Sequence, residues 1–136
     1  MKVYQIDRLQ SVLNIAACII TFTSKYDYIT PVLVRLHWLP VSYRIRFKVL
    51  LLTYKSLNDL SPEYISEVLN KPKYTRNLRY QSQHLLSVPK SRTVTYGDRV
   101  CAPKLWNELP FQLRMSSNIQ AFKSGLKKML FKMAYL

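Results

Sequence analysis

Carboxylates are the first residues to consider for chemistry, because metal-dependent phosphoryl transfer uses acidic side chains that hold two metal ions. The chain has seven acids, and no two aspartates are adjacent: Asp7, Asp27, Asp59, Glu63, Glu67, Asp98 and Glu108. Glu63 and Glu67 are spaced for one helix face, but they follow Pro62, and acids in a first helical turn favour the helix dipole. The acids therefore predict no catalytic site built on paired carboxylates.

Cysteine, histidine and glycine also argue against catalysis. Cys18 and Cys101 stand alone, whereas a structural zinc site needs four ligands in close pairs, so both thiols are expected to be buried as small apolar groups. His37 and His84 lie far from either cysteine. With two glycines, the chain cannot build a phosphate-cradling loop. We expect no metal, no cofactor, no small-molecule substrate and no enzymatic activity.

Lysine and arginine give the strongest signal. They number 21 against seven acids, a net charge of +14, and such a surface attracts polyanions. The segment 71–99 has the largest imbalance, with one acid and seven cationic residues: Lys71, Lys73, Arg76, Arg79, Lys90, Arg92 and Arg99. Because cations neutralise phosphates and the interleaved Tyr74, Tyr80 and Tyr96 can stack on nucleobases, we expect contact with RNA or DNA here. The alternative is a solvated loop whose tyrosines complete the core beneath it.

A second group of cations falls on one predicted helix. At 100° per residue, Arg44, Lys48 and Lys55 share a stripe about 40° wide, and mostly apolar residues surround it. This pattern predicts a largely buried helix with one charged seam. We therefore include these three residues among the candidate contacts for nucleic acid.

Apolar periodicity predicts a small, mainly α-helical domain of about five helices, with a short β-hairpin in the 84–97 region. Three parts are expected in this one domain: a helical part over 1–70, the basic loop or hairpin over 71–99, and over 100–136 a short helix plus a C-terminal amphipathic helix. Helical signals lie at about 6–20, 32–36, 42–58, 63–69, 102–107 and 117 onward.

Capping and packing patterns refine these helices. Thr30 before Pro31, Ser42, and Ser117 with Gln120 are expected N-terminal caps. The first helix is expected to bury one side, formed by Ile6, Leu9, Leu13, Ala16, Ala17 and Ile20. Ile15 and Ile19 are expected to broaden this buried side. The last helix is expected to bury a stripe opposite its four lysines: Ile119, Phe122, Leu126, Met129, Leu130 and Met133. Trp38 and Trp106, each in a block that ends at proline, are expected to anchor the core.

The expected compartment depends on the lengths of the apolar runs and on the polar residues near the N-terminus. The longest of these, 15–20 and 49–52, are far short of the ~20 residues of a membrane span. Asp7, Arg8 and Gln10 fall where a secretory signal needs an apolar core. We expect an intracellular protein, nuclear or cytoplasmic, without a membrane partner.

Several blocks in order carry a family resemblance. The run from Leu36 to Ile65 is followed by Tyr96-Gly-Asp-Arg and by the block Ala102 to Pro110, with further similarity from Asp7 through Tyr28-Ile-Thr-Pro-Val-Leu to the closing Ser124-Gly-Leu-Lys-Lys-Met-Leu-Phe. Together they resemble the C-terminal region of reverse transcriptases from LINE-type (non-LTR) retrotransposons. The resemblance implies a region that follows the polymerase thumb and helps to hold template RNA or target DNA. The metal-binding aspartates of such an enzyme are absent here.

The sequence and the resemblance together lead to one expected function and two alternatives. We expect a non-catalytic C-terminal fragment of a retrotransposon RNA-directed DNA polymerase that binds RNA or DNA without sequence specificity through a basic surface. Alternatively, the chain is a structural module that docks onto the polymerase part of the parent element, or a decayed remnant with no selected function.

Overall fold

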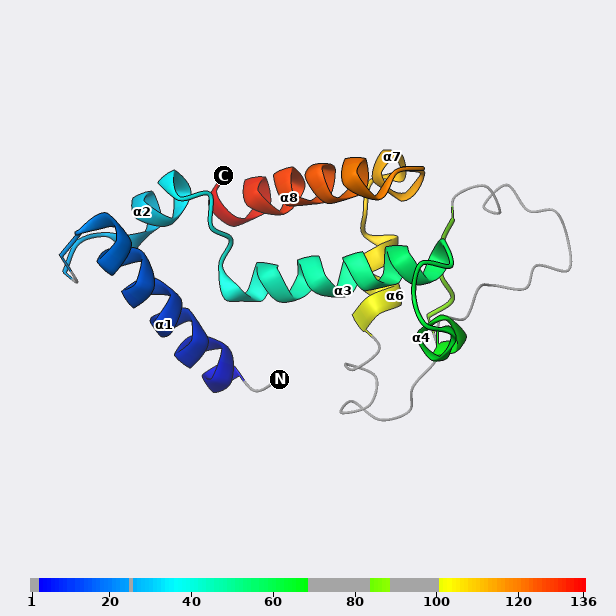
Figure 1. Cartoon of the computed structure of the whole chain (residues 1–136), viewed down its shortest axis with the longest axis horizontal. Helices are drawn as coiled ribbons and strands as arrows, with labels where there is room; N and C mark the ends of the chain where they lie inside the picture. Colours follow the sequence, from blue (N-terminus) through cyan, green and yellow to red (C-terminus); the bar gives the residue numbers. More distant parts are fainter. Residues whose placement is uncertain (1–2, 25, 69–83, 89–100) are drawn as a thin grey trace, which may run out of the picture. The chain divides into compact units, whose positions relative to one another are not determined.

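The structure, a computed structural model, describes residues 3–24, 26–68, 84–88 and 101–136, and this part of the chain is mainly α-helical (Figure 1). It contains seven helices: α1 Val3–Thr21, α2 Ile29–Arg35, α3 Val41–Leu57, α4 Glu63–Val68, α6 Cys101–Asn107, α7 Phe111–Arg114 and α8 Ile119–Tyr135. The predicted helical class is confirmed. The predicted β-hairpin is not seen among the described residues: 84–88 forms no strand, and the second half of the expected hairpin lies outside them.

The chain divides into two compact units. Unit 1 comprises Met1–Phe47 and Lys127–Leu136, and unit 2 comprises Lys48–Leu126. The long helices α3 and α8 therefore each contribute residues to both units. The sequence analysis expected one domain and did not predict this division.

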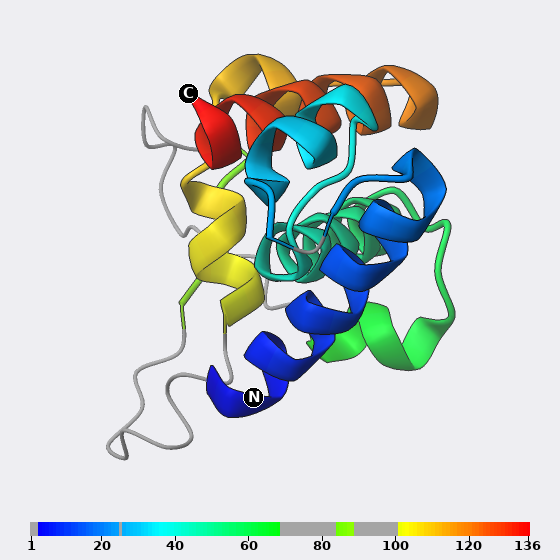
Figure 2. The same cartoon turned by 90° about the vertical axis from the view of Figure 1, so that its left-hand side faces the viewer.

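Unit 1 is built around α1 and α2, which lie side by side (Figure 2). Ala17 of α1 and Val32 and Leu33 of α2 form its buried cluster, and partly buried residues pack against it: Ile29, Leu36, Trp38 and Tyr135. The Tyr135 hydroxyl donates a hydrogen bond to the Trp38 carbonyl at 2.5 Å. Trp38 thus anchors the turn after α2 as expected, although its side chain is only half-buried.

Unit 2 has the larger aromatic core. Trp106, Tyr54, Phe122 and Leu126 are its largest fully buried side chains, and the rings of Tyr54 and Phe122 stack 4.2 Å apart. The prediction that Trp106 anchors the core is confirmed. Gly125 lets α7 approach α8 closely, since a Cβ there would lie 2.5 Å from Leu113 Cδ2.

The helix N-termini differ from the predicted caps. Val41 begins α3, and its backbone N–H donates to Oε1 of Gln10 in α1 at 2.9 Å, so Ser42 lies inside the helix. The N-cap of α2 is Tyr28, without a side-chain hydrogen bond, and not Thr30. At α8 the side chain of Asn118 accepts from the Gln120 N–H at 2.8 Å, in place of the expected box between Ser117 and Gln120. These cap predictions were wrong. The N-terminus of α3 depends on a tertiary contact, and the caps of α2 and α8 lie one or two residues from the predicted positions.

Three helices end in a left-handed residue that is not glycine. Phe22, His37 and Asp59 follow α1, α2 and α3 with φ of 53°, 53° and 55°. After α1 the N–H of Thr23 donates to the Cys18 carbonyl, which is the six-to-one bond of a Schellman motif. Glycine is the residue that adopts this conformation without steric cost, so these three positions hold backbone strain.

The buried side of α1 also differs from the prediction. Its buried centre is Ala17, and the half-buried residues around it include the polar Gln10, Asn14 and Thr21, none of which belongs to the predicted apolar side. Leu9 and Ile20, expected to be buried, are exposed, as are Ile15 and Ile19. Since α1 is apolar around most of its circumference, periodicity alone could not choose the side. In α8 the predicted stripe is confirmed at Phe122, Leu126 and Leu130, whereas Met133 is exposed.

Candidate nucleic-acid interface

Seven of the ten predicted contact residues fall where the structure gives no description. Lys71, Lys73, Arg76 and Arg79 lie within 69–83, and Lys90, Arg92 and Arg99 lie within 89–100, both outside the described residues. Their assignment remains a prediction. The described residues around these segments nevertheless define where the segments are attached.

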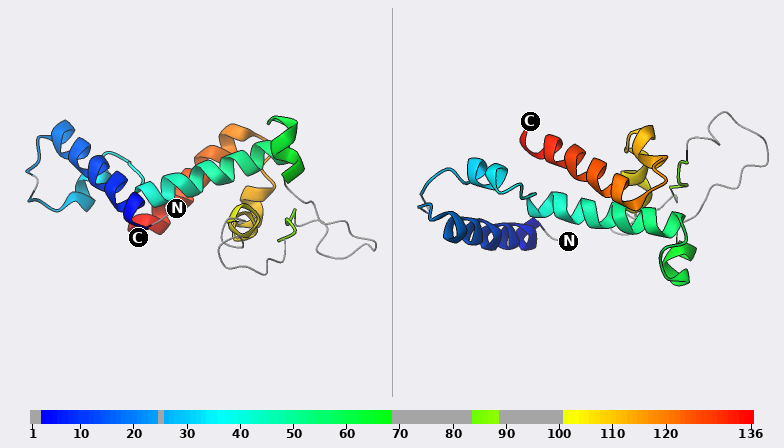
Figure 3. Two further views of the ribbon diagram at one scale, coloured as in Figure 1. Left: turned by 90° about the horizontal axis from the view of Figure 1, so that it is seen from below. Right: turned by 45° about the horizontal axis from the view of Figure 1, so that its top comes forward.

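The attachment is the short segment 84–88, which lies against α6 in unit 2 (Figure 3). The Asn107 side chain accepts from the Leu86 N–H through Oδ1 and donates to the Leu86 carbonyl through Nδ2, each at 2.9 Å. The Trp106 indole N–H donates to the His84 carbonyl at 2.8 Å, and the Leu86 side chain is buried. One helix thus fixes the backbone between the two basic segments.

Asn107 is a residue of the candidate site that the sequence analysis did not identify. An asparagine carboxamide offers one acceptor and two donors, so it can pair with both backbone groups of one residue as a neighbouring strand would. The sequence signal was its place directly after Trp106 in the block Ala102 to Pro110. That block is therefore the mount for the segment that carries most of the predicted contacts.

The α3 stripe is described, and it faces away from the core. Leu50 and Tyr54 are buried, and at 100° per residue Lys48 and Lys55 lie on roughly the opposite side of the helix. Lys48 is exposed and Lys55 is half-buried. Both ammonium groups thus belong to the solvent side of α3, where a phosphate could reach them.

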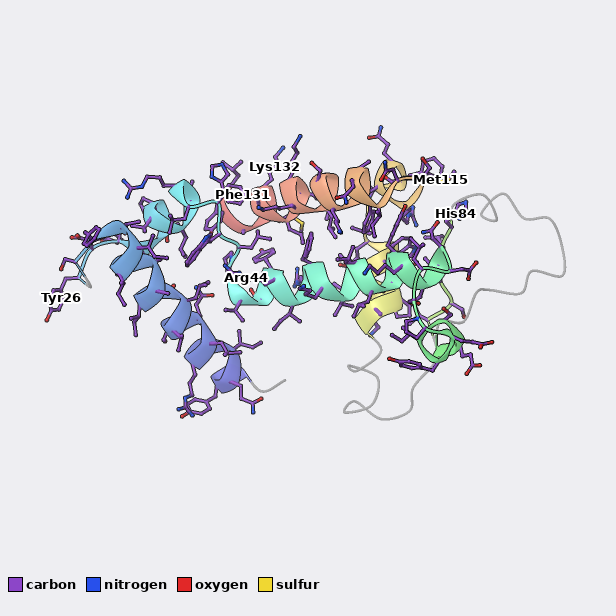
Figure 4. All side chains as sticks on the ribbon, viewed as in Figure 1. Tyr26, Arg44, His84, Met115, Phe131 and Lys132 are labelled. Atoms are coloured by element: carbon purple, nitrogen blue, oxygen red, sulfur yellow. The ribbon has the colours of Figure 1, made fainter. Side chains whose placement is uncertain are left out.

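Arg44 has a different environment from the two lysines. Its Nε donates to the Leu39 carbonyl at 2.9 Å, and its guanidinium lies over the Trp38 ring, 5.5 Å from the ring centroid. Figure 4 shows Arg44 at the beginning of α3. These contacts hold the turn before α3, so Arg44 already has a structural role, and only its remaining N–H groups are available to a phosphate.

Helix α8 adds four lysines on two flanks. Lys123 and Lys127 lie on one side of the buried stripe, and Lys128 and Lys132 lie on the other. Three are exposed, including Lys132, which points away from α8 in Figure 4, and Lys123 is half-buried. The lysines avoid the apolar stripe as expected, but they flank it on two sides and do not share one opposite face.

Arg114 in α7 is a cation that sequence reasoning did not single out. Its Nε and Nη1 are buried without a hydrogen-bond partner, and burial lowers the pKa of its guanidinium. Arginine titrates so far above neutrality that the group remains charged. Buried donors of this kind are not accessible to a ligand, so we do not count Arg114 among the contacts.

Within residues 3–24, 26–68, 84–88 and 101–136, no group of three or more His, Cys, Asp or Glu could hold a metal ion. None of the helices described there is long and apolar enough to cross a membrane. Glu63 and Glu67 are exposed on α4, and Glu63 occupies its first turn, as the capping interpretation expects.

Comparison with known proteins gives no match: no family model, no curated protein and no solved structure matches this chain.

Proposed function

We propose that the chain is a non-catalytic C-terminal fragment of a retrotransposon RNA-directed DNA polymerase that binds RNA or DNA without sequence specificity through its basic residues. The observation that carries the proposal is the way α6 holds 84–88 through Asn107 and Trp106. This mount lies between two segments with seven cations and one acid. Side chains attached to a fixed scaffold lose less conformational freedom when they bind phosphates than those on a free chain.

Lys48 and Lys55 support the same proposal from the described part of unit 2. Both lie on the solvent side of α3, away from the buried Leu50 and Tyr54. Cations that contact phosphate must be accessible, and these two meet that condition. They would extend the basic segment onto a helix, whereas Arg44 serves mainly to hold Trp38.

The experiment is the salt dependence of binding to single-stranded RNA of unrelated sequences. If about five cations contact phosphates, log K falls against log salt with a slope near −3.5, at ~0.7 per contact. Replacing Arg76, Arg79, Lys90 and Arg92 by Gln should flatten the slope by roughly 3 units. Changing Lys48 and Lys55 to Gln should flatten it by at most about 1.4.

The matched control removes the same charge from α8. Lys123, Lys127, Lys128 and Lys132 are replaced by Gln, a residue that keeps helix propensity, and this variant should lose less affinity and less slope. Equal losses in both four-residue variants would mean that net charge alone governs binding, and the proposed surface would then be wrong. Binding that does not respond to salt would favour the module that docks onto the polymerase body.

A further inference from the structure

Helix α1 has a second apolar side that nothing in unit 1 covers. Tyr4, Val12, Ile15 and Ile19 fall on one side at helical spacing, and each is between 59% and 68% exposed. The opposite side is centred on the fully buried Ala17. A helix that is apolar on both sides is typical of one buried between two partners. We name the exposed side, with Arg8 between its apolar residues, the α1 arc.

The α1 arc is large enough to form an interface. Phe22 at the end of α1 is 97% exposed, and Ile20 beside it is also exposed. With ~150–250 Å² for an aromatic side chain and ~60–120 Å² for an aliphatic one, these residues and the arc expose roughly 500–700 Å². That lies at or above the upper end of the ~300–600 Å² of the largest apolar patch on a typical monomer, and it approaches the ~800 Å² that each partner of a standard interface contributes.

Charge indicates what covers the arc. Residues 3–29 contain two acids and two bases (Asp7, Arg8, Lys25 and Asp27), a net charge of zero, whereas the whole chain carries +14. A neutral segment is a poor surface for nucleic acid or anionic lipid, which both need cations. It is also where two strongly basic chains can approach each other with the least repulsion.

The position of the charges selects an antiparallel arrangement. Ile15 and Ile19 also line an open groove of about 570 Å³ that has Asp27 at its wall. Two α1 helices related by a two-fold axis between positions 11 and 12 would set Tyr4 opposite Ile19 and Arg8 opposite Ile15 of the partner, because paired positions then sum to 23. Arg8 would approach the partner's Asp27, which lines the same groove as Ile15. A parallel pair would instead oppose Arg8 to Arg8.

We propose that α1 is a self-association surface through which two copies of this chain form an antiparallel, two-fold symmetric dimer. Tyr4, Val12, Ile15 and Ile19 supply the apolar contact, and Arg8 of each copy pairs with Asp27 of the other. The dimer is independent of nucleic-acid binding, since the cations assigned to that function lie outside residues 3–29.

The test is the molar mass by sedimentation equilibrium at about 1–100 µM, in a reducing agent because Cys18 lies in the groove. The unmodified protein should be dimeric at the upper end. Ile15→Glu with Ile19→Glu should raise the dimer Kd at least ~100-fold, because each interface would bury four carboxylates. A matched pair at exposed positions in unit 2, Leu52→Glu with Leu60→Glu, should leave the Kd unchanged.

A charge exchange tests the orientation. Arg8→Asp and Asp27→Arg should each raise the Kd about 10-fold, and the two together should restore it. Circular dichroism and urea unfolding at 1 µM exclude loss of the fold as the cause. A monomer at 100 µM whose α1 arc still binds an apolar dye would overturn the proposal and assign the arc to a different protein. Dimerisation unaffected by Ile15→Glu with Ile19→Glu would overturn it equally.

Discussion

The rings of Tyr54 and Phe122 stack with their centroids 4.2 Å apart and their planes 16° from parallel. The two residues are 68 positions apart, on α3 and α8, and both are buried. The Tyr54 hydroxyl leaves the apolar core to donate to the Ser116 carbonyl at 2.7 Å, so this hydroxyl is not left unpaired. Trp106 lies next to the same pair, with its ring centroid 6.0 Å from that of Phe122.

Phe122→Ala should be among the most damaging substitutions in unit 2. Removing a buried phenylalanine costs about 3–5 kcal/mol, which is comparable with the whole stability of a marginal domain. Tyr54→Phe keeps the ring and loses one hydrogen bond, at about 1 kcal/mol. Urea unfolding measures both. Met133→Ala, at an exposed position of the same helix, should change stability by less than ~0.5 kcal/mol, and a Phe122→Ala protein no less stable than this control would contradict the assignment.

Asn107→Ala should loosen the segment 84–88. Both backbone groups of Leu86 lose their partner in this variant, at a cost of about 1–3 kcal/mol. Limited proteolysis should then cut at 84–88 faster, and urea unfolding should report the lower stability. Asn107→Asp is the informative companion, because its carboxylate can accept from the Leu86 N–H but repels the Leu86 carbonyl. If the aspartate variant resists protease as well as the unmodified chain does, the two-bond pairing is not what holds the segment.

The elements predictable from sequence are those whose signal is local. The stripe in α8 was found because Phe122, Leu126 and Leu130 repeat at helical spacing and the lysines avoid it. The N-terminal cap of α3 was not predictable, because the Val41 N–H pairs with Gln10, which lies 31 residues away. The run at 84–88 is predicted as half of a hairpin, and the structure shows its Leu86 paired with the Asn107 side chain of α6. No composition rule indicates that pairing, because it joins residues 21 positions apart.

The candidate site was also only partly predictable from the sequence. Its cations can be identified from the sequence, whereas the roles of Arg44 and Asn107 depend on neighbours that only the fold brings together. Arg44 shares a stripe with Lys48 and Lys55, yet its guanidinium lies on Trp38. The side of α1 that is buried also could not be predicted, because an apolar period marks two sides of that helix equally.

Phe22→Gly should stabilise the protein. Phe22 has φ of 53° and a side chain that is 97% exposed, so glycine relieves backbone strain and removes almost no buried apolar surface. The gain is about 1 kcal/mol, less the entropy that glycine restores to the unfolded chain. It should be measured by urea unfolding at low protein concentration. Asp59→Gly should gain less, because aspartate tolerates the left-handed region better than phenylalanine does; a larger gain at Asp59 would contradict this account.

Tyr135 should make stability fall at alkaline pH. Burial raises the pKa of its hydroxyl, and Arg44 opposes this in part. A tyrosine whose folded pKa is raised contributes stability that is fully present below about pH 10, its unfolded pKa, and is lost as pH rises through the folded value. The phenolate would also lose the hydrogen bond to the Trp38 carbonyl. Urea unfolding from pH 8 to 11 should show a steeper decline than in Tyr135→Phe; parallel curves would exclude this contribution.

The purified protein should extend no primer on an RNA template with magnesium or manganese. Polymerisation needs carboxylates that hold two metal ions, and the sequence has no adjacent aspartates. The measurement is incorporation of labelled nucleotide against a control without protein. Incorporation that survives further purification and is lost in Glu63→Gln with Glu67→Gln would show that the acids form a site after all.

The hydrogen bond from Val41 to Gln10 has a consequence for the order in which the chain folds. The first turn of α3 closes locally, with the Arg44 N–H donating to the Pro40 carbonyl at 3.0 Å, but the Val41 N–H pairs only with a residue 31 positions earlier. Amides in the middle of α3 can gain protection as soon as the helix nucleates. The Val41 amide should become protected from hydrogen exchange only when α1 has docked, and Gln10→Ala should speed its exchange alone. Val41 is therefore a natural reporter of the docking of α1.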